Sequence, residues 1–174
     1  VFMLTRELLV SSLDNLLNSK IYKDYGPNGL QVEGKETIQK IVTGVTASEA
    51  LILAAIENKA DAILVHHGLF WRGQDGTVKG WMKKRLALLL AHNINLIAYH
   101  LPLDGHETLG NNAQIGAQLN IPVESRFGEQ NLGLMGSCAL PSSLELTQKI
   151  QEKISTQVTV VGPVMQALPG QALQ

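Results

Sequence analysis

The sequence predicts an α/β fold: a mostly parallel sheet flanked by helices, followed by the beginning of a second α/β lobe. Segments typical of strands and of helices alternate along the chain. Three of the strand segments, 41–46, 62–65 and 96–98, are apolar runs, as expected for parallel strands covered on both faces. Hydrophobic residues make up 45% of the 174 residues and charged residues 17%, which supports a packed core and argues against disorder.

The expected elements follow in order along the chain. Leucines from Leu4 to Leu17 recur at helical spacing, so we expect an amphipathic first helix that ends near Asn18. A loop rich in turn-forming residues, 24–29, comes next. Ser48 is a plausible N-cap for a later helix. The remaining expectations for this region are strands at 41–46, 62–66 and 96–100 and helices at 48–59, 78–92 and 112–119.

Beyond Pro122 the alternation weakens. We expect a strand at 132–140, a helix at 144–154 and another strand at 158–161. The chain is therefore divided into a first α/β lobe, 1–125, which carries the metal-ligand motifs, and a partial second lobe, 126–174. The tail, 165–174, has no capping element and is typical of an interrupted chain.

Composition excludes several classes of protein. The formal net charge is −1, so nucleic acid is an unlikely partner and nothing attracts the chain to a membrane surface. Cys138 is the only cysteine, which excludes an internal disulfide and a thiolate zinc cluster and favours the cytoplasm. No apolar stretch is long enough to span a membrane, and Arg6 and Glu7 stand where a signal peptide would be apolar.

Two adjacent histidines, His66 and His67, are the strongest functional signal in the sequence. They end an apolar run and come directly before Gly68. Imidazole is the commonest metal ligand. Two imidazoles at the end of a buried strand are costly to desolvate unless a ligand or metal ion binds them. Because adjacent side chains of a strand point to opposite faces, we expect the backbone to leave the strand here, at a turn that Gly68 permits.

A second polar cluster, with His100, Asp104 and His106, follows the next expected strand. The carboxyl ends of neighbouring parallel strands face one crevice, where open α/β sheets place their ligands. We therefore expect His66, His67 and Asp104 to be metal ligands, since two imidazoles and a carboxylate suit a divalent transition metal. Alternatively, each histidine serves a different ion of a pair. One carboxylate balances little of the charge of two dications, so these residues represent half of such a site.

Several neighbouring residues have both a functional and a structural interpretation. His100 either orients a ligand or hydrogen-bonds the nucleophile, as a catalytic residue would, or is an ordinary histidine beside the sheet. Asn111 and Asn112 either cap the following helix or belong to a helix N-terminus that receives a phosphate. Phe70 and Trp71 either stack on a purine base or pack in a subunit interface.

Four motifs in a consistent order resemble the Nif-three-like family, also called GTP cyclohydrolase 1 type 2 homologues. The similarity runs from about residue 4 to residue 125 and is weak after that. Four spaced motifs are far more specific than any one of them. They are DYGPNGLQVEGKE (24–36), KIVTGVTAS (40–48), ADAILVHHGLFW (60–71) and HLPLDGHETLGNNAQ (100–114).

This resemblance implies a two-lobed α/β protein that forms a toroidal homohexamer with a dinuclear metal centre. By position, His66, His67 and Asp104 correspond to the ligands of the family's first lobe. The family takes its remaining ligands, a histidine and a bridging glutamate, from a C-terminal segment. The present sequence stops before such a segment, so it is expected to be C-terminally incomplete relative to the family and to hold only half of the ligands.

The resemblance and the ligand set lead to two hypotheses. In the first, the protein is a metal-dependent hydrolase acting on a nucleotide or related heterocycle, with two divalent ions (zinc, iron or manganese) per full-length subunit. Asp104 and His67 would then hold one ion and His66 the other, while His100 steadies the nucleophile. In the second, it is a non-catalytic, ring-shaped metal-binding or partner-binding scaffold. DNA binding is disfavoured by the near-neutral charge.

Overall fold

The computed structural model describes residues 4–140, 142–154 and 157–162. The chain divides into two compact units, one up to Leu103 and one from Asp104, and each is described by itself. The boundary expected after residue 125 falls inside the second unit and stays a prediction. The expected interrupted tail at 165–174 lies outside the described residues. Among the residues that are described, no helix is both long and apolar enough to cross a membrane.

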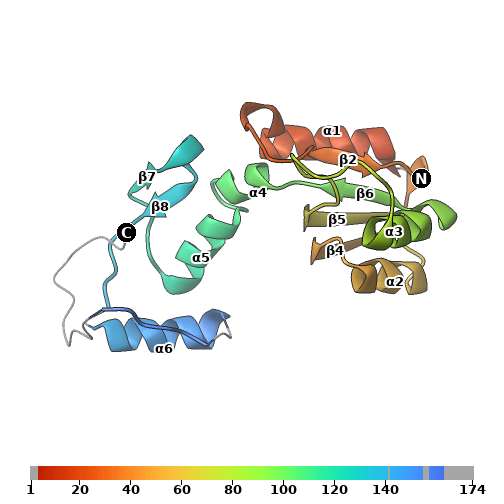
Figure 1. The fold of residues 1–174 in the computed structure, drawn as a ribbon. Coiled ribbons are helices and arrows are strands. Elements are labelled where there is room, and N and C mark those ends of the chain that lie inside the picture. The colour runs from red at the N-terminus through yellow and green to blue at the C-terminus, as the bar shows by residue number, and fades with distance from the viewer. Residues whose placement is uncertain (1–3, 141, 155–156, 163–174) are drawn as a thin grey trace. The chain divides into compact units, whose positions relative to one another are not determined.

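The first unit contains a four-stranded sheet (Figure 1). Its strands lie in the order β2 (Gly29–Val32), β6 (Asn95–Ala98), β5 (Ala62–His67) and β4 (Ile41–Thr46). β4, β5 and β6 are parallel, and β2 pairs with β6 in the antiparallel direction. The mostly parallel sheet predicted from the apolar runs is therefore present, and its three parallel strands are the three that the sequence indicates.

The helices of this unit begin and end where the sequence signals lie. α1 (Arg6–Leu17) starts after Thr5, whose hydroxyl accepts a hydrogen bond from Leu8 N, and ends at Asn18 in the left-handed conformation. α2 (Glu49–Glu57) starts after Ser48, whose hydroxyl accepts from a backbone N–H, so the predicted N-cap is confirmed. α3 (Gly80–Ala91) falls within the segment expected to be helical.

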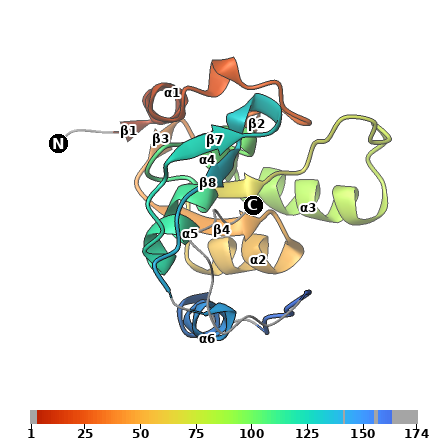
Figure 2. The same cartoon turned by 90° about the vertical axis from the view of Figure 1, so that its left-hand side faces the viewer.

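The sheet has two buried faces, and each of the three parallel strands contributes alternate residues to them. In β5, Ile63 and Val65 join a core cluster with residues of α2 and α3, whereas Ala62 and Leu64 join a second cluster with residues of α1. Figures 1 and 2 accordingly show α1 on one side of the sheet and α2 and α3 on the other. Apolar side chains on both faces explain why these strands are apolar throughout instead of alternating.

At the amino end of β5, Asp61 ties the sheet to the preceding segment. Its carboxylate accepts hydrogen bonds from Lys35 Nζ at 2.6 Å, Gln39 N at 2.9 Å and Lys40 N at 3.0 Å. Burial alone would raise the pKa of Asp61, but these bonds outweigh it and lower the pKa below its ordinary value. Smaller elements complete the unit: β1 (Leu4–Thr5) paired with β3 (Thr37–Ile38), and η1 (Ser19–Ile21).

The second unit holds a helix, a short hairpin and a further helix. α4 (Leu101–Gly105) crosses the division between the units. It is followed by α5 (Asn111–Leu119), β7 (Ser125–Phe127), η2 (Glu129–Asn131), β8 (Gly133–Met135) and α6 (Ser143–Ile154). β7 and β8 form an antiparallel pair. A mostly apolar groove of about 250 Å³ runs between α5 and β8.

Two expectations for this unit are corrected. The strand predicted at 132–140 is shorter, since β8 covers only Gly133–Met135. The strand predicted at 158–161 is not formed, although these four residues are all described. An apolar run becomes a strand only when a neighbouring strand accepts its backbone hydrogen bonds, and the described part of the chain provides no such partner for 158–161.

Candidate metal centre

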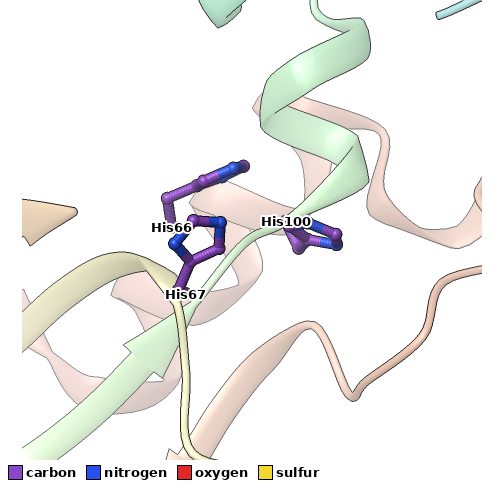
Figure 3. Close-up of side chains that lie close together, drawn as sticks. All are labelled: His66, His67 and His100. Carbon is purple, nitrogen blue, oxygen red and sulfur yellow. The ribbon is translucent and has the colours of Figure 1, made fainter. Parts of the chain in front are cut away.

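The three histidines that follow the parallel strands lie together. His66 and His67 are the last two residues of β5, one residue beyond the expected strand end, and His100 comes just before α4. Val65 of β5 is paired with Ala98 of β6, so the two strand ends are neighbours. The ring centroids are 4.4 Å apart for His66 and His67, 4.9 Å for His66 and His100, and 5.6 Å for His67 and His100 (Figure 3).

This cluster can supply ligands to a metal ion. One ring nitrogen from each of His66, His67 and His100 lies within 4.8 Å of the others, and all three residues are partly buried. Nitrogen ligands bind zinc at about 2.0–2.1 Å in a tetrahedral arrangement, so two such nitrogens are about 3.4 Å apart. The upper bound of 4.8 Å in the cluster exceeds this separation, so the rings would have to move closer together to hold a single tetrahedral ion.

Hydrogen bonds to the Nδ1 atoms orient the rings of β5. His66 Nδ1 lies 3.1 Å from the carbonyl oxygen of Tyr99. Because a carbonyl only accepts, Nδ1 carries the proton and the lone pair is on Nε2, the arrangement that metal-binding histidines commonly use. His67 Nδ1 lies 3.2 Å from Thr46 Oγ1, which can donate or accept. Thr46 is the residue of β4 that pairs with His67.

His100 is held from the loop before β2. Its Nδ1 atom lies 2.8 Å from Asp24 Oδ1, and the Asp24 side chain is only 3% exposed. Burial would raise the pKa of Asp24, but hydrogen bonds from His100, Asn28 and two backbone N–H groups outweigh it, so the pKa lies below its ordinary value. Asp24 is therefore an ionised carboxylate at neutral pH that faces an imidazole of the cluster.

Gly68 allows the loop after β5 to pass close to β2. A Cβ atom at Gly68 would collide with the side-chain amide of Gln31. That amide accepts a hydrogen bond from Leu69 N at 2.8 Å and donates one to the carbonyl oxygen of Pro27 at 2.8 Å. The sequence suggested that glycine is needed here for an unusual turn, whereas the structure shows that a side chain here would displace the Gln31 amide from these two hydrogen bonds.

Aromatic residues border the cluster. The Trp71 ring meets the His100 ring edge-on at 5.0 Å and lies 6.1 Å from that of His67. Phe70 instead packs against the hydrophobic core. A hollow of about 10 Å³, enough for one water-sized group, lies beside the rings. It is lined by Gly26, Pro27, Asn28, Gln31, His66, Gly68, Phe70, Trp71, Ala98 and His100.

The other residues singled out in the sequence lie in the second unit. Asp104 is in α4, and its carboxylate accepts a hydrogen bond from Asn111 Nδ2 at 2.8 Å; its role as a metal ligand stays a prediction. The N-cap of α5 is Gly110 without a side-chain hydrogen bond, so the expected capping by Asn111 and Asn112 is wrong. Asn112 instead donates to a hairpin carbonyl, and His106 Nδ1 accepts from two backbone N–H groups of a turn.

Sequence reasoning missed three residues that support the histidines. Asp24 contacts His100, Thr46 contacts His67, and Gln31 fixes the loop after β5. Asp24 and Gln31 both lie in the segment 24–36 that carries the family resemblance, where a carboxylate beside turn dipeptides is typical of an ordinary turn. Nothing in the local pattern distinguishes Thr46 from an ordinary β-branched strand residue.

An α/β unit with histidines gathered at the carboxyl ends of its parallel strands defines a class of proteins able to bind a metal ion there. The sequence profile of the Duf34/NIF3 family (NGG1p interacting factor 3) matches residues 4–169. The chain therefore belongs to this family, and the resemblance seen in the four motifs is confirmed.

Individual relatives agree with this assignment. A protein of Neisseria meningitidis serogroup A named GTP cyclohydrolase 1 type 2 homolog is 50% identical over 161 residues, which are 92% of this chain and 65% of the relative. A protein of the same name from Escherichia coli K12 is 50% identical over 143 residues, 82% of this chain and 57% of the relative.

A solved structure of protein ybgI, described as of unknown function, matches with a TM-score of 0.83 and 46% identity, over 87% of this chain and 61% of that chain. The mixed α/β fold with helices flanking a central sheet is thus the fold of the family. The chain spans less than two thirds of the length of each of these three relatives.

Proposed function

We propose that the protein binds divalent metal ions at the histidine cluster and that its full-length form is a dinuclear-metal hydrolase acting on a nucleotide or related heterocycle. The observation that carries the proposal is the convergence of ring nitrogens from His66, His67 and His100 to within 4.8 Å of one another. The shared name of the relatives, GTP cyclohydrolase 1 type 2 homolog, supports the class of reaction and substrate.

The donor chemistry fits a transition-metal ion. Neutral imidazoles suit zinc, iron and related ions, and the lone pair of His66 is directed to Nε2 by the Tyr99 carbonyl. In this proposal His66, His67 and Asp104 hold the ions, and His100, the third histidine of the cluster, either adds its Nε2 nitrogen to the ligands or holds and moves a proton. When bound, a divalent ion supplies Lewis acidity for hydrolysis. Trp71 and the loop around Gly68 border one side of the cluster.

The complete protein is proposed to bind two ions (zinc, iron or manganese), to form a toroidal homohexamer and to work in the cytoplasm. Three uncharged imidazoles and one carboxylate leave most of the positive charge of two divalent ions unbalanced. We therefore infer that further ligands come from residues other than those of the four motifs. A membrane or nucleic-acid partner is not part of the proposal, because the net charge is only −1.

The direct test is the metal content of the full-length protein and of its His67→Ala variant. We expect the variant to lose metal, with affinity reduced by at least about tenfold, because one nitrogen ligand is gone. His92→Ala is the control, since His92 is an exposed residue at the C-terminal end of α3. Elemental analysis and titration calorimetry give the stoichiometry and affinity. Equal metal binding by wild type and His67→Ala would contradict the proposal.

A non-catalytic metal-binding scaffold is the second candidate. The hollow beside the histidines, at about 10 Å³, accommodates a water-sized group but not a heterocycle, which favours metal binding over substrate binding at this hollow. A panel of nucleotides assayed with zinc, iron and manganese separates the two candidates. Turnover that His67→Ala abolishes supports the hydrolase, whereas a stable, metal-loaded oligomer in light scattering without turnover supports the scaffold.

A further inference from the structure

We infer that Asp24 is a positioning residue: together with Asn28, it fixes the ring and the tautomer of His100 so that the Nε2 lone pair is presented to the histidine cluster. The inference concerns an arrangement present without metal. Its consequence for metal affinity rests on the proposed function.

Asp24 uses both carboxylate oxygens. Oδ1 accepts from Tyr25 N at 2.6 Å and faces His100 Nδ1 at 2.8 Å. Oδ2 accepts from Leu101 N at 2.8 Å and from Asn28 Nδ2 at 2.9 Å. Both oxygens already accept hydrogen bonds from N–H groups, so the carboxylate is also the acceptor in its contact with the imidazole, and His100 Nδ1 carries the proton. A neutral His100 therefore has its lone pair on Nε2.

Asn28 holds the backbone of the same residue. Its side-chain oxygen accepts from His100 N at 2.8 Å, while its side-chain nitrogen donates to Asp24. The loop thus contacts both the ring of His100, through Asp24, and its backbone N–H group, through Asn28. Both groups belong to the first unit, as does His100 itself.

The loop that carries Asp24 is in turn fastened to the loop after β5. Arg72 donates from Nη2 to the carbonyl oxygen of Asp24 at 2.8 Å, and Arg72 N donates to the carbonyl oxygen of Tyr25 at 2.6 Å. At Gly26, a Cβ atom would collide with the carbonyl oxygen of Phe70. The carboxylate is therefore set on a rigid support, which a positioning group requires if it is to hold a ligand in one orientation.

The variant Asp24→Asn makes a specific prediction about the tautomer. With its amide oxygen toward His100, the asparagine NH₂ group would face two donors, Leu101 N and Asn28 Nδ2. With the amide reversed, it faces only one donor, Tyr25 N, and donates to His100 Nδ1. The reversed orientation has fewer conflicts, so the proton of His100 is expected to move to Nε2. That tautomer cannot offer an Nε2 lone pair.

The matched control is Asp61→Asn. Like Asp24, Asp61 accepts hydrogen bonds from two backbone N–H groups and one cationic or cation-capable side chain, in this case Lys35; Asp24 accepts one further bond, from Asn28. It lies at the amino end of β5, whereas the histidines lie at the carboxyl end. The two variants therefore remove comparable hydrogen bonds from the same unit, but only one of them touches the cluster.

The test is a set of two-bond ¹H–¹⁵N correlation spectra of the imidazoles in metal-free full-length protein at about pH 8, where histidine is largely neutral. A His100→Gln spectrum assigns the resonances. Unsubstituted protein and Asp61→Asn should show His100 protonated at Nδ1, and Asp24→Asn should show it protonated at Nε2. Protonation at Nε2 in the unsubstituted protein, or an unchanged tautomer in folded Asp24→Asn, would overturn the inference. The first measurement needs no substitution, so it decides even if the variant fails to fold.

Metal titration supplies the functional readout. Loss of a group that orients a metal-binding histidine typically lowers affinity by about 10–100-fold, and we expect that loss for Asp24→Asn but not for Asp61→Asn. Equal affinity of the two variants would count against Asp24 as a positioning residue. If the unsubstituted full-length protein binds no metal while its His100 tautomer is as expected, the proposed function fails and the positioning of His100 stands.

Discussion

At the scale of single residues, the candidate site depends on side chains that fix other side chains. Each of the three histidines has an oxygen atom near Nδ1: the Tyr99 carbonyl, the Thr46 hydroxyl or the Asp24 carboxylate. Such contacts reduce the rotational freedom that a ring would otherwise lose on binding an ion. The histidine cluster is thus oriented in advance by the fold of the first unit.

Gly68 allows a test of close packing at this scale. Gly68→Ala is expected to destabilise the protein by about 1–3 kcal/mol, because the new Cβ meets the Gln31 amide and overpacking forces neighbouring atoms to move. Urea denaturation measures the change. Gly76→Ala is the matched control, since a Cβ there meets nothing within 4 Å.

A second substitution identifies the cause of that loss. If the collision with Gln31 is responsible, Gly68→Ala should cost less in a Gln31→Ala background than in the unsubstituted protein, as a double-mutant cycle would show. Additive effects of Gly68→Ala and Gln31→Ala would mean that the destabilisation arises elsewhere.

At the scale of elements, one buried hydroxyl joins α1 to the sheet. Tyr99 follows β6 and is 1% exposed. Its hydroxyl donates to Asp14 Oδ1 at 3.0 Å and lies 3.3 Å from the carbonyl oxygen of Val10, both in α1. Burial, followed by the Asp14 carboxylate, raises the pKa of Tyr99 well above its ordinary value. The same residue offers its own carbonyl to His66, so the attachment of α1 and the orientation of the cluster share a residue.

Tyr99→Phe is expected to lower the free energy of unfolding by about 1.5–3 kcal/mol, the usual range for a hydrogen bond to a charged group. The backbone carbonyl that contacts His66 is unchanged, so metal binding should be largely retained. Tyr22→Phe is the control, because no hydrogen bond of the Tyr22 hydroxyl is found among the described residues. Chemical denaturation and metal titration of both variants check the prediction, and a Tyr99→Phe protein as stable as Tyr22→Phe would refute it.

At the scale of the whole molecule, buried carboxylates make stability depend on pH. The pKa of Asp61 is lowered in the folded protein, so its folded form favours the ionised state more than the unfolded chain does. The resulting stabilisation is fully present above the unfolded value of 3.8 and is lost as the pH falls through the lower folded pKa. The protein should therefore lose stability on the acid side, below about pH 4.

Asp61→Asn should remove part of this dependence. We expect the variant to be less stable than the unsubstituted protein by about 1–3 kcal/mol at pH 7, with the difference shrinking as the pH falls below about 4. Urea denaturation from pH 7 to pH 3 measures it. Asp75→Asn is the exposed control and should show a smaller effect, because solvent screens its contacts with Thr77 and Lys79. A constant difference across the range would contradict the assignment to Asp61.

Local sequence patterns were sufficient to predict the α/β class, the three parallel strands and the placement of His66, His67 and His100 at their ends. These features follow from local patterns: apolar runs of strand length, helical leucine spacing and the order of the elements, which together restrict the topology to a few possibilities. The family resemblance could be recognised from the same residues and is confirmed.

The groups that support the histidines could be identified only in the folded protein. Asp24 is 76 residues from His100, and no local rule connects a carboxylate in a turn-rich loop with an imidazole after β6. The requirement for Gly68 likewise became clear only when β2 was seen to pass beside it. A side chain hydrogen-bonds the groups that lie close to it in the folded protein. Which groups these are depends on the assembly of the whole sheet, not on the neighbouring residues in the sequence.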